Sequence, residues 1–200
     1  ALLGGIVNLA ALSRPLTAEE QARGLRAVPV ARDRIAIVIG VHNPFQRGLS
    51  LNQIADIFQG RITNWATFGG VDRPIRVLLR PGVSGTSKAF RSLVLANGAF
   101  GSGVNITTLT RDATTPMLRQ LATDGIGYAT YGQVADQQTA RVLAIDGLTP
   151  EAANYPLQRP LFYAFRTPAE PSVRAFLGYA LSAEAKSRVE AAVGGRKDPG

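Results

Sequence analysis

One stretch near the middle of the chain combines residue types that can hold a small anion. Residues 80–86 read Arg80-Pro-Gly-Val-Ser-Gly-Thr86 and lead into a helical pattern. A helix N-terminus exposes unpaired N–H groups and carries partial positive charge. Gly85 lets the backbone approach an anion closely, and Ser84 and Thr86 add hydroxyl donors. Because Arg80 can offer a planar fork to an oxyanion, these donors could converge on one tetrahedral oxyanion without a metal.

The same stretch also fits a helix start that binds no ligand. Ser84 would then be an ordinary N-cap, with Gly85 and Thr86 incidental and Arg80 solvated. A nucleotide-binding P-loop fits less well. That motif needs G-x-x-x-x-G-K-[ST], and Ser87 stands where its second Gly belongs.

The composition excludes several kinds of catalytic and metal site. The chain has no Cys and one His, which removes thiol nucleophiles and multi-His metal sites and argues against a His-based triad. The glycine pairs Gly101-Ser-Gly103 and Gly125-Ile-Gly127 do not extend to the dinucleotide fingerprint. Ser84 has no His nearby in sequence, and the acidic residues are scattered. We therefore expect no cofactor, no metal and no enzymatic activity.

The charge is uneven along the chain. The net charge is +8, and residues 1–100 carry +7 of it, which suggests an anionic partner. The basic residues are scattered without the aromatic interleaving of a nucleic-acid surface, so no nucleic-acid partner is expected. No run approaches about 18 apolar residues, so no membrane span is expected.

The elements around the anion motif are expected to alternate between strands and helices. Apolar runs rich in β-branched or aromatic residues predict strands at 34–40, 74–80, 126–131, 141–145 and 160–165. Capping boxes at Thr17 and Ser50 predict two helix starts, and Ser84 opens a third helix directly after the second strand. This alternation predicts an α/β fold with mostly parallel sheets.

Several motifs keep a fixed order along nearly the whole chain. They are Ala11-Leu-Ser-Arg-Pro-Leu-Thr17, Leu49-Ser-Leu-Asn-Gln-Ile-Ala-Asp-Ile-Phe-Gln-Gly60, Arg61-Ile-Thr-Asn-Trp65, Arg80 with Ser84-Gly-Thr86, Gly125-Ile-Gly-Tyr128 and Tyr155-Pro-Leu-Gln-Arg-Pro-Leu161. Each is weak alone. In this order and spacing, the chain resembles the periplasmic phosphate-binding proteins of ABC-type phosphate uptake systems.

The resemblance implies a two-lobed α/β fold of the type II periplasmic-binding-protein kind that closes around an oxyanion like a hinge. Lobe one would hold residues 1–35 and 143–200, and lobe two, with the anion site, residues 36–142. The family's phosphate ligands map onto Arg80, Ser84, Gly85 and Thr86 in lobe two and onto Ser13 in lobe one. The ligand would be inorganic phosphate or a similar oxyanion, bound in the inter-lobe cleft for delivery to an ABC transporter permease. The location would be periplasmic or otherwise extracytoplasmic.

The start of the sequence departs from the family. Members usually carry a further strand and anion-binding loop ahead of Ser13, so this chain is expected to be an N-terminally short member. Residues 1–11 lack the basic region of a signal peptide. Some members place an Asp beside the anion, whereas Arg14 stands at the neighbouring position here. Alternative functions are therefore an oxyanion sensor, a cell-envelope scaffold, or a fragment of a larger chain without complete binding.

Five other residues have structural interpretations. We expect Trp65 to pack a turn, His42 to lie at the surface, and Tyr128 to sit in the core with its hydroxyl as a polar group at the end of the ring. Asp33 is expected to form an ion pair near the crossover between lobes. Arg159 is expected at a solvated strand edge.

Overall fold

The computed structural model describes residues 1–194, and the described chain divides into two compact units. The first unit holds Ala1–Asp33 and Gln158–Val193, and the second holds Arg34–Leu157. The chain thus returns to the first unit at Gln158, later than residue 143, where the sequence placed the start of the second lobe-one segment. The reason is that β6 (Ala140–Leu143) pairs with β2 (Leu25–Gly40), and Leu157 joins the core of the second unit. Residues 195–200 of the expected lobe lie outside the described residues.

The sheet of the second unit is mixed. Strand β3 (Arg76–Leu79) lies between β4 (Ile106–Thr108) and β5 (Gly125–Thr130) and runs parallel to both. The end of β2 pairs antiparallel with β5 and β6. The expectation of mostly parallel strands is therefore wrong. A run of apolar residues predicts that a strand is buried, but it carries no information about the direction of the neighbouring strand.

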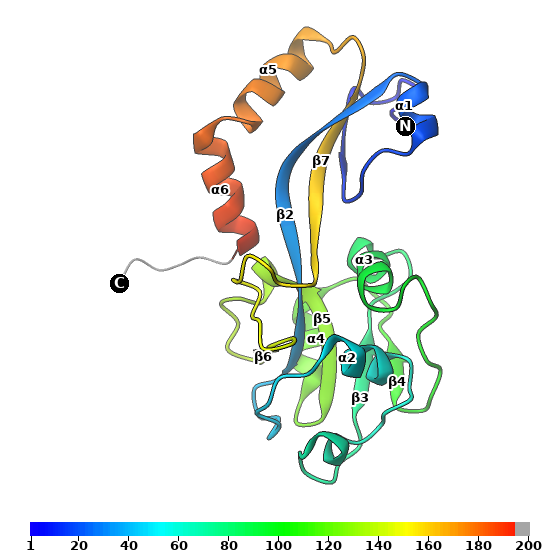
Figure 1. The fold of residues 1–200 in the computed structure, drawn as a ribbon, viewed down its shortest axis with the longest axis vertical. Coiled ribbons are helices and arrows are strands. Elements are labelled where there is room, and N and C mark those ends of the chain that lie inside the picture. Colours follow the sequence, from blue (N-terminus) through cyan, green and yellow to red (C-terminus); the bar gives the residue numbers. More distant parts are fainter. Residues whose placement is uncertain (195–200) are drawn as a thin grey trace. The chain divides into compact units, whose positions relative to one another are not determined.

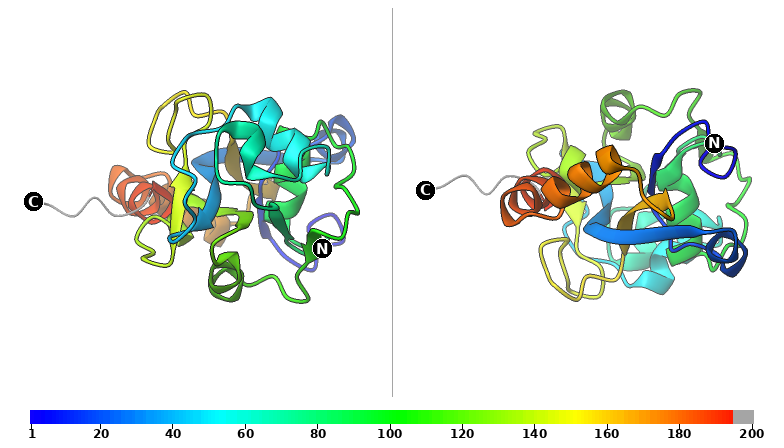
Figure 2. Two further views of the ribbon diagram at one scale, coloured as in Figure 1. Left: turned by 90° about the horizontal axis from the view of Figure 1, so that it is seen from below. Right: turned by 90° about the horizontal axis from the view of Figure 1, so that it is seen from above.

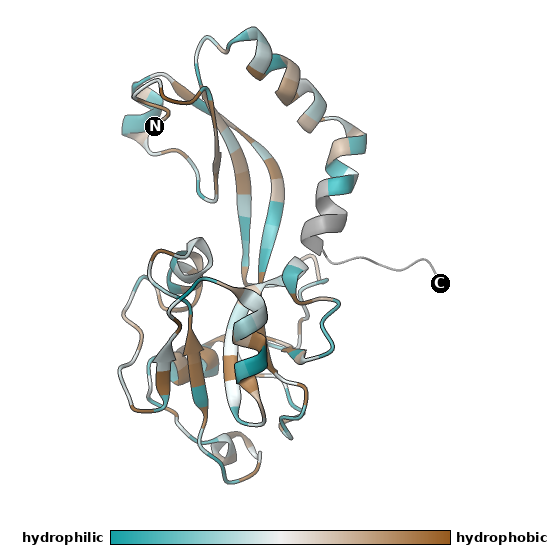
Figure 3. Cartoon of the chain, turned by 180° about the vertical axis from the view of Figure 1, so that it is seen from behind, coloured by the Kyte–Doolittle hydropathy of each residue, from teal (hydrophilic) through white to brown (hydrophobic). Residues whose placement is uncertain are grey.

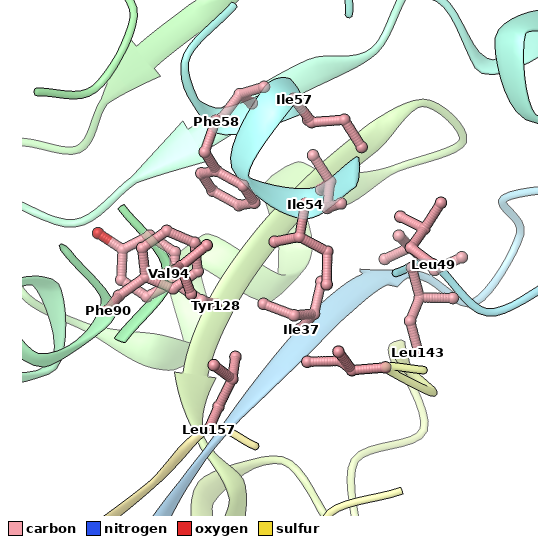
Figure 4. Packing of buried hydrophobic residues seen from close by; sticks show 14 of the residues in the cluster. Ile37, Leu49, Ile54, Ile57, Phe58, Phe90, Val94, Tyr128, Leu143 and Leu157 are labelled. Carbon is pink, nitrogen blue, oxygen red and sulfur yellow. The ribbon is translucent and has the colours of Figure 1, made fainter. Parts of the chain in front are cut away.

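Helices cover both faces of this sheet (Figures 1 and 2). Helices α2 (Leu51–Phe58) and α3 (Gly85–Val94) pack on one face, and α4 (Thr114–Leu121) packs on the other. Successive strand residues point to opposite faces, so Ile37 and Ile39 join the α2–α3 cluster and Val38 joins the α4 cluster. Figure 4 shows the first of these clusters. Burial of each large apolar side chain contributes roughly 1.5–3 kcal/mol to stability.

Both predicted capping boxes are confirmed. The Ser50 hydroxyl accepts the N–H of Gln53 at 3.1 Å, and the Gln53 side chain accepts the N–H of Ser50 at 2.8 Å, which fixes the start of α2. Thr17 and Glu20 form the same reciprocal pair at the start of α1 (Ala18–Ala22). These contacts satisfy N–H groups that a helix start leaves without partners.

The first unit is built on three strand segments. Strand β7 (Gln158–Arg166) lies between β1 (Leu9–Leu12) and β2, and β1 pairs with it antiparallel. Helices α5 (Pro171–Ala180) and α6 (Ala183–Gly194) follow, with apolar and polar residues interspersed along α5 (Figure 3). Within the described part of the chain, no helix is both long and apolar enough to span a membrane.

Candidate anion-binding site

The predicted anion motif lies at a strand end and a helix start. Arg80 directly follows β3, and Ser84 is the N-cap of α3. The intervening turn is closed by the N–H of Ser84, which donates to the Pro81 carbonyl at 2.9 Å. The Ser84 hydroxyl accepts the N–H of Ser87 at 3.3 Å. Because that bond uses the hydroxyl oxygen only as an acceptor, the hydroxyl proton remains available to an anion.

The Arg80 side chain is buried and held from two sides. It is 5% exposed, so the interpretation of Arg80 as a solvated side chain is wrong. Its Nε donates to Asp112 Oδ1 at 2.6 Å, and its Nη1 donates to Thr114 Oγ1 at 3.1 Å. The Thr114 hydroxyl in turn donates to Gln133 Oε1 at 2.7 Å. These bonds fix the plane of the guanidinium group.

The remaining nitrogen of Arg80 can still bind a ligand. Among the residues that the structure describes, none accepts a hydrogen bond from Nη2 of Arg80. A guanidinium group whose orientation is fixed and whose outer N–H groups are unbound is suited to an oxyanion, since charge-assisted hydrogen bonds to arginine are short and strong.

The first turn of α3 adds further donors. Within the described part of the chain, neither the N–H nor the hydroxyl of Thr86 donates to another residue. A Cβ placed on Gly85 would meet nothing within 4 Å, so there is open space beside the backbone at this position. This first turn therefore offers both donors and room for a small anion.

A buried tyrosine hydroxyl contacts both pieces of the motif. The Tyr128 hydroxyl accepts the backbone N–H of Arg80 at 3.3 Å and donates to Ser87 Oγ at 3.0 Å. Burial raises the pKa of Tyr128, and the hydrogen bond with Ser87 opposes that rise. The hydroxyl therefore stays protonated at neutral pH and can both donate and accept. The expectation of a core tyrosine is confirmed.

The predicted ligand residues fall in both units. Arg80, Ser84, Gly85 and Thr86 lie together in the second unit. Ser13 lies in the first unit, directly after β1, and is exposed.

Two residues that orient Arg80 were not predicted from the sequence. Asp112 and Thr114 lie 32 and 34 positions away in the sequence. Neither belongs to a recognisable motif, and one Asp and one Thr near a helix start are common in any sequence. Only the pairing of β3 with β5, and the packing of α4 on the sheet, bring them to the end of β3.

The other interpretations of single residues have mixed outcomes. Trp65 is buried within the core and His42 is exposed, as expected. The ion pair of Asp33 is confirmed, with Arg159 Nη2 at 2.6 Å from its carboxylate. The solvated position expected for Arg159 is therefore wrong, because its side chain is 12% exposed. In the described part of the chain, no three His, Cys, Asp or Glu side chains are grouped as a metal site would require.

The chain matches a known protein family over most of its length. The model of the PBP superfamily domain matches residues 1–184. The phosphate-binding protein PstS of Bacillus subtilis (strain 168) is 30% identical over 141 residues, which is 68% of this chain and 45% of that protein. The match thus spans less than half of the curated relative.

Solved structures agree with that match. A putative phosphate ABC transporter substrate-binding protein from Clostridium perfringens, solved with bound phosphate, has a TM-score of 0.78 and 30% identity. The alignment covers 96% of this chain and 80% of the Clostridium chain. An ABC-type phosphate transport receptor from Vibrio cholerae has a TM-score of 0.80 at 24% identity, over 99% of this chain and 82% of that one, and shows the shared fold. The predicted type II binding-protein fold and the resemblance to phosphate-binding proteins are confirmed.

Proposed function

Because the chain belongs to the PBP superfamily domain family, we propose that it binds inorganic phosphate through the strand end and helix start at residues 80–86. The observation that carries the proposal is how the Arg80 side chain is held. Its guanidinium is buried and oriented by Asp112 and Thr114, while Nη2 has no acceptor among the described residues. Thr86 and the Ser84 hydroxyl proton supply further donors in the first turn of α3.

The binding mode is non-catalytic. Affinity comes from charge-assisted hydrogen bonds that replace the water around the anion, and no bond of the ligand is broken. The names of the Bacillus and Clostridium relatives, a phosphate-binding protein and a transporter substrate-binding protein, support this reading. Delivery of the anion to an ABC permease, and a location outside the cytoplasm, are part of the same proposal.

Two parts of the proposal rest on the sequence alone. Participation of Ser13 and closure of two lobes over the anion remain predictions from the family resemblance. The alternatives of an oxyanion sensor or an envelope scaffold have no observation in their favour.

The decisive test is titration calorimetry with inorganic phosphate on the wild type and on Arg80→Ala. We expect the variant to lose several kcal/mol of binding free energy, on the order of 2–5, because a buried charged partner is removed. Arg119→Ala is the matched control. It removes one positive charge from an exposed position on α4 of the same unit and should leave the affinity within about twofold.

Two outcomes would reject the proposal. One is wild-type protein that takes up no phosphate, and the other is an Arg80→Ala variant that binds as tightly as the wild type. Competition with sulfate, run in the same calorimeter, reports which oxyanion the site prefers.

A further inference from the structure

The two pieces of the anion site are joined by a turn with little packing of its own. Residues 81–83 connect Arg80 to Ser84, and the Val83 side chain in this turn is 82% exposed. Within the turn, the backbone N–H of Ser84 donates to the Pro81 carbonyl. Contacts from outside the turn can add to this restraint on the separation between the end of β3 and the start of α3.

The Tyr128 hydroxyl supplies such a contact. It accepts the backbone N–H of Arg80 and donates to the Ser87 hydroxyl, while the Ser87 N–H donates to Ser84 Oγ. A continuous set of three hydrogen bonds thus runs from the strand end, through one buried oxygen, to the helix N-cap. The Tyr128 hydroxyl both accepts and donates, so it joins the strand end to Ser87, and the backbone N–H of Ser87 carries the link on to Ser84.

The position of this hydroxyl is itself fixed. Tyr128 is fully buried on β5, its ring stacks on Phe90 at 4.2 Å between centroids, and Phe58 meets it edge-on at 5.6 Å (Figure 4). Phe90 belongs to α3 and Phe58 to α2. The aromatic contacts depend on the ring and not on the oxygen, so the ring and the hydroxyl can be tested separately.

We infer that Tyr128 is a positioning residue for the anion site. It sets the distance between Arg80 and the first turn of α3 through its hydroxyl, without contacting the anion itself. The inference rests on the proposed phosphate-binding function and adds to it a residue that lies in the core of the sheet.

The test compares two tyrosine-to-phenylalanine variants. Tyr128→Phe keeps the ring stack and removes the oxygen. Tyr155→Phe is the matched control, because Tyr155 is also buried in the second unit and its hydroxyl donates to the Ile35 carbonyl at 2.9 Å. Tyr128→Phe loses two buried hydrogen bonds and Tyr155→Phe loses one, so both variants should lose thermal stability, Tyr128→Phe the more. We expect Tyr128→Phe to bind inorganic phosphate about tenfold more weakly and Tyr155→Phe to bind as the wild type does.

A second measurement separates positioning from general destabilisation. Ser87→Ala removes the acceptor of the Tyr128 hydroxyl, so combining it with Tyr128→Phe should weaken binding less than the product of the two single effects. Amide hydrogen exchange at Arg80 should also be faster in Tyr128→Phe than in Tyr155→Phe.

The outcomes can be distinguished. Wild-type protein that fails to bind phosphate rejects the proposed function and this inference with it. If the wild type binds phosphate and Tyr128→Phe binds it with unchanged affinity, only the positioning role is rejected. The same holds if the effects of Tyr128→Phe and Ser87→Ala on affinity are independent. If Tyr128→Phe and Tyr155→Phe lose the same phosphate affinity, the loss reflects lower protein stability. The positioning role of Tyr128 is then rejected as well.

Discussion

The second unit buries large apolar clusters on both faces of its sheet, with ring contacts among Phe58, Phe90, Phe100 and Tyr128. In the first unit, the cluster formed by the described residues has three buried members, Leu2, Leu25 and Ala164. The first unit also pairs β1 with β7 over four residues of each strand. The donors of residues 80–86 thus lie in the unit whose core can hold them rigidly.

The helices of the first unit leave apolar surface open to solvent. A cavity of about 420 Å³ lies between its strands and the helices α5 and α6. Phe176 and Tyr179, which line it, are 41% and 54% exposed. Binding sites are more precise when rigid elements position them, so the better-packed second unit is the more suitable of the two for holding the anion donors.

Removing a core ring from the second unit should have the largest effect on stability, because the second unit is packed more densely than the first. Phe90→Ala removes a fully buried ring that contacts Phe58 and Tyr128, and it should lower the free energy of unfolding by about 3–5 kcal/mol. Trp65 is the single Trp and is buried in the second unit, so its fluorescence during urea unfolding reports on that unit.

The same Phe-to-Ala substitution in the first unit should lower stability only slightly. Phe176→Ala removes a partly exposed ring of the first unit and should lower the stability of that unit by about 0.5 kcal/mol or less, measured by amide hydrogen exchange in β1 and β7. Equal losses of stability in the two units, each measured by its own reporter, would mean that the units do not differ in packing in the way described.

One hydroxyl substitution in each unit tests how much each unit contributes to the free energy of anion binding. Thr86→Val removes a hydroxyl from the first turn of α3 with little change in shape. It should cost about 1.5–3 kcal/mol of phosphate binding measured by calorimetry, the value of a hydrogen bond to a charged group. Ser13→Ala removes the one hydroxyl that the family resemblance assigns in the first unit, and it should cost a similar amount.

Measured together, these two variants show which unit supplies ligands to the anion. Comparable losses would mean that both units contribute ligands. Loss in Thr86→Val with full affinity in Ser13→Ala would assign binding to the second unit alone and would contradict the predicted role of Ser13.

Local signals predicted the elements that hold the site. The β-branched run before Arg80 and the Ser N-cap after it identify a strand, a turn and a helix, because burial and capping leave patterns in adjacent residues. Strands β1 and β4 were not predicted. They are the segments Leu-Ala-Ala-Leu and Ile-Thr-Thr, and pairing with longer strands defines them.

Contacts between distant residues could not be predicted in the same way. The partners of Arg80 come from Asp112 and Thr114, and the partner of Asp33 is Arg159, 126 positions away in the sequence. Ion pairs of this kind depend on which strands are neighbours and in which direction they run. A single sequence does not contain that information when the strands are short apolar runs.

The smallest expected effect concerns a surface contact in the first unit. Glu20 pairs with Arg14 at 2.8 Å and accepts the backbone N–H of Thr17. The hydrogen bond from Arg14, followed by that from Thr17, lowers the pKa of Glu20 from 4.5 to about 2. Glu20→Gln removes the charge but keeps a side chain that can complete the capping box of α1.

The sign of the pH dependence follows from this lowered pKa. The folded state holds Glu20 ionised more strongly than the unfolded state does, so the contact stabilises the protein above pH 4.5. That stabilisation declines as the pH falls from 4.5 towards 2, because the carboxylate must then take up a proton. Wild type should therefore unfold at a slightly higher urea concentration than Glu20→Gln at pH 7, with the difference vanishing near pH 2. The effect is small because the pair lies at the surface, with the Arg14 side chain 52% exposed, where ion pairs contribute little. A difference that grew as the pH fell would contradict the assignment, and NMR titration of the Glu20 carboxyl carbon measures the pKa directly.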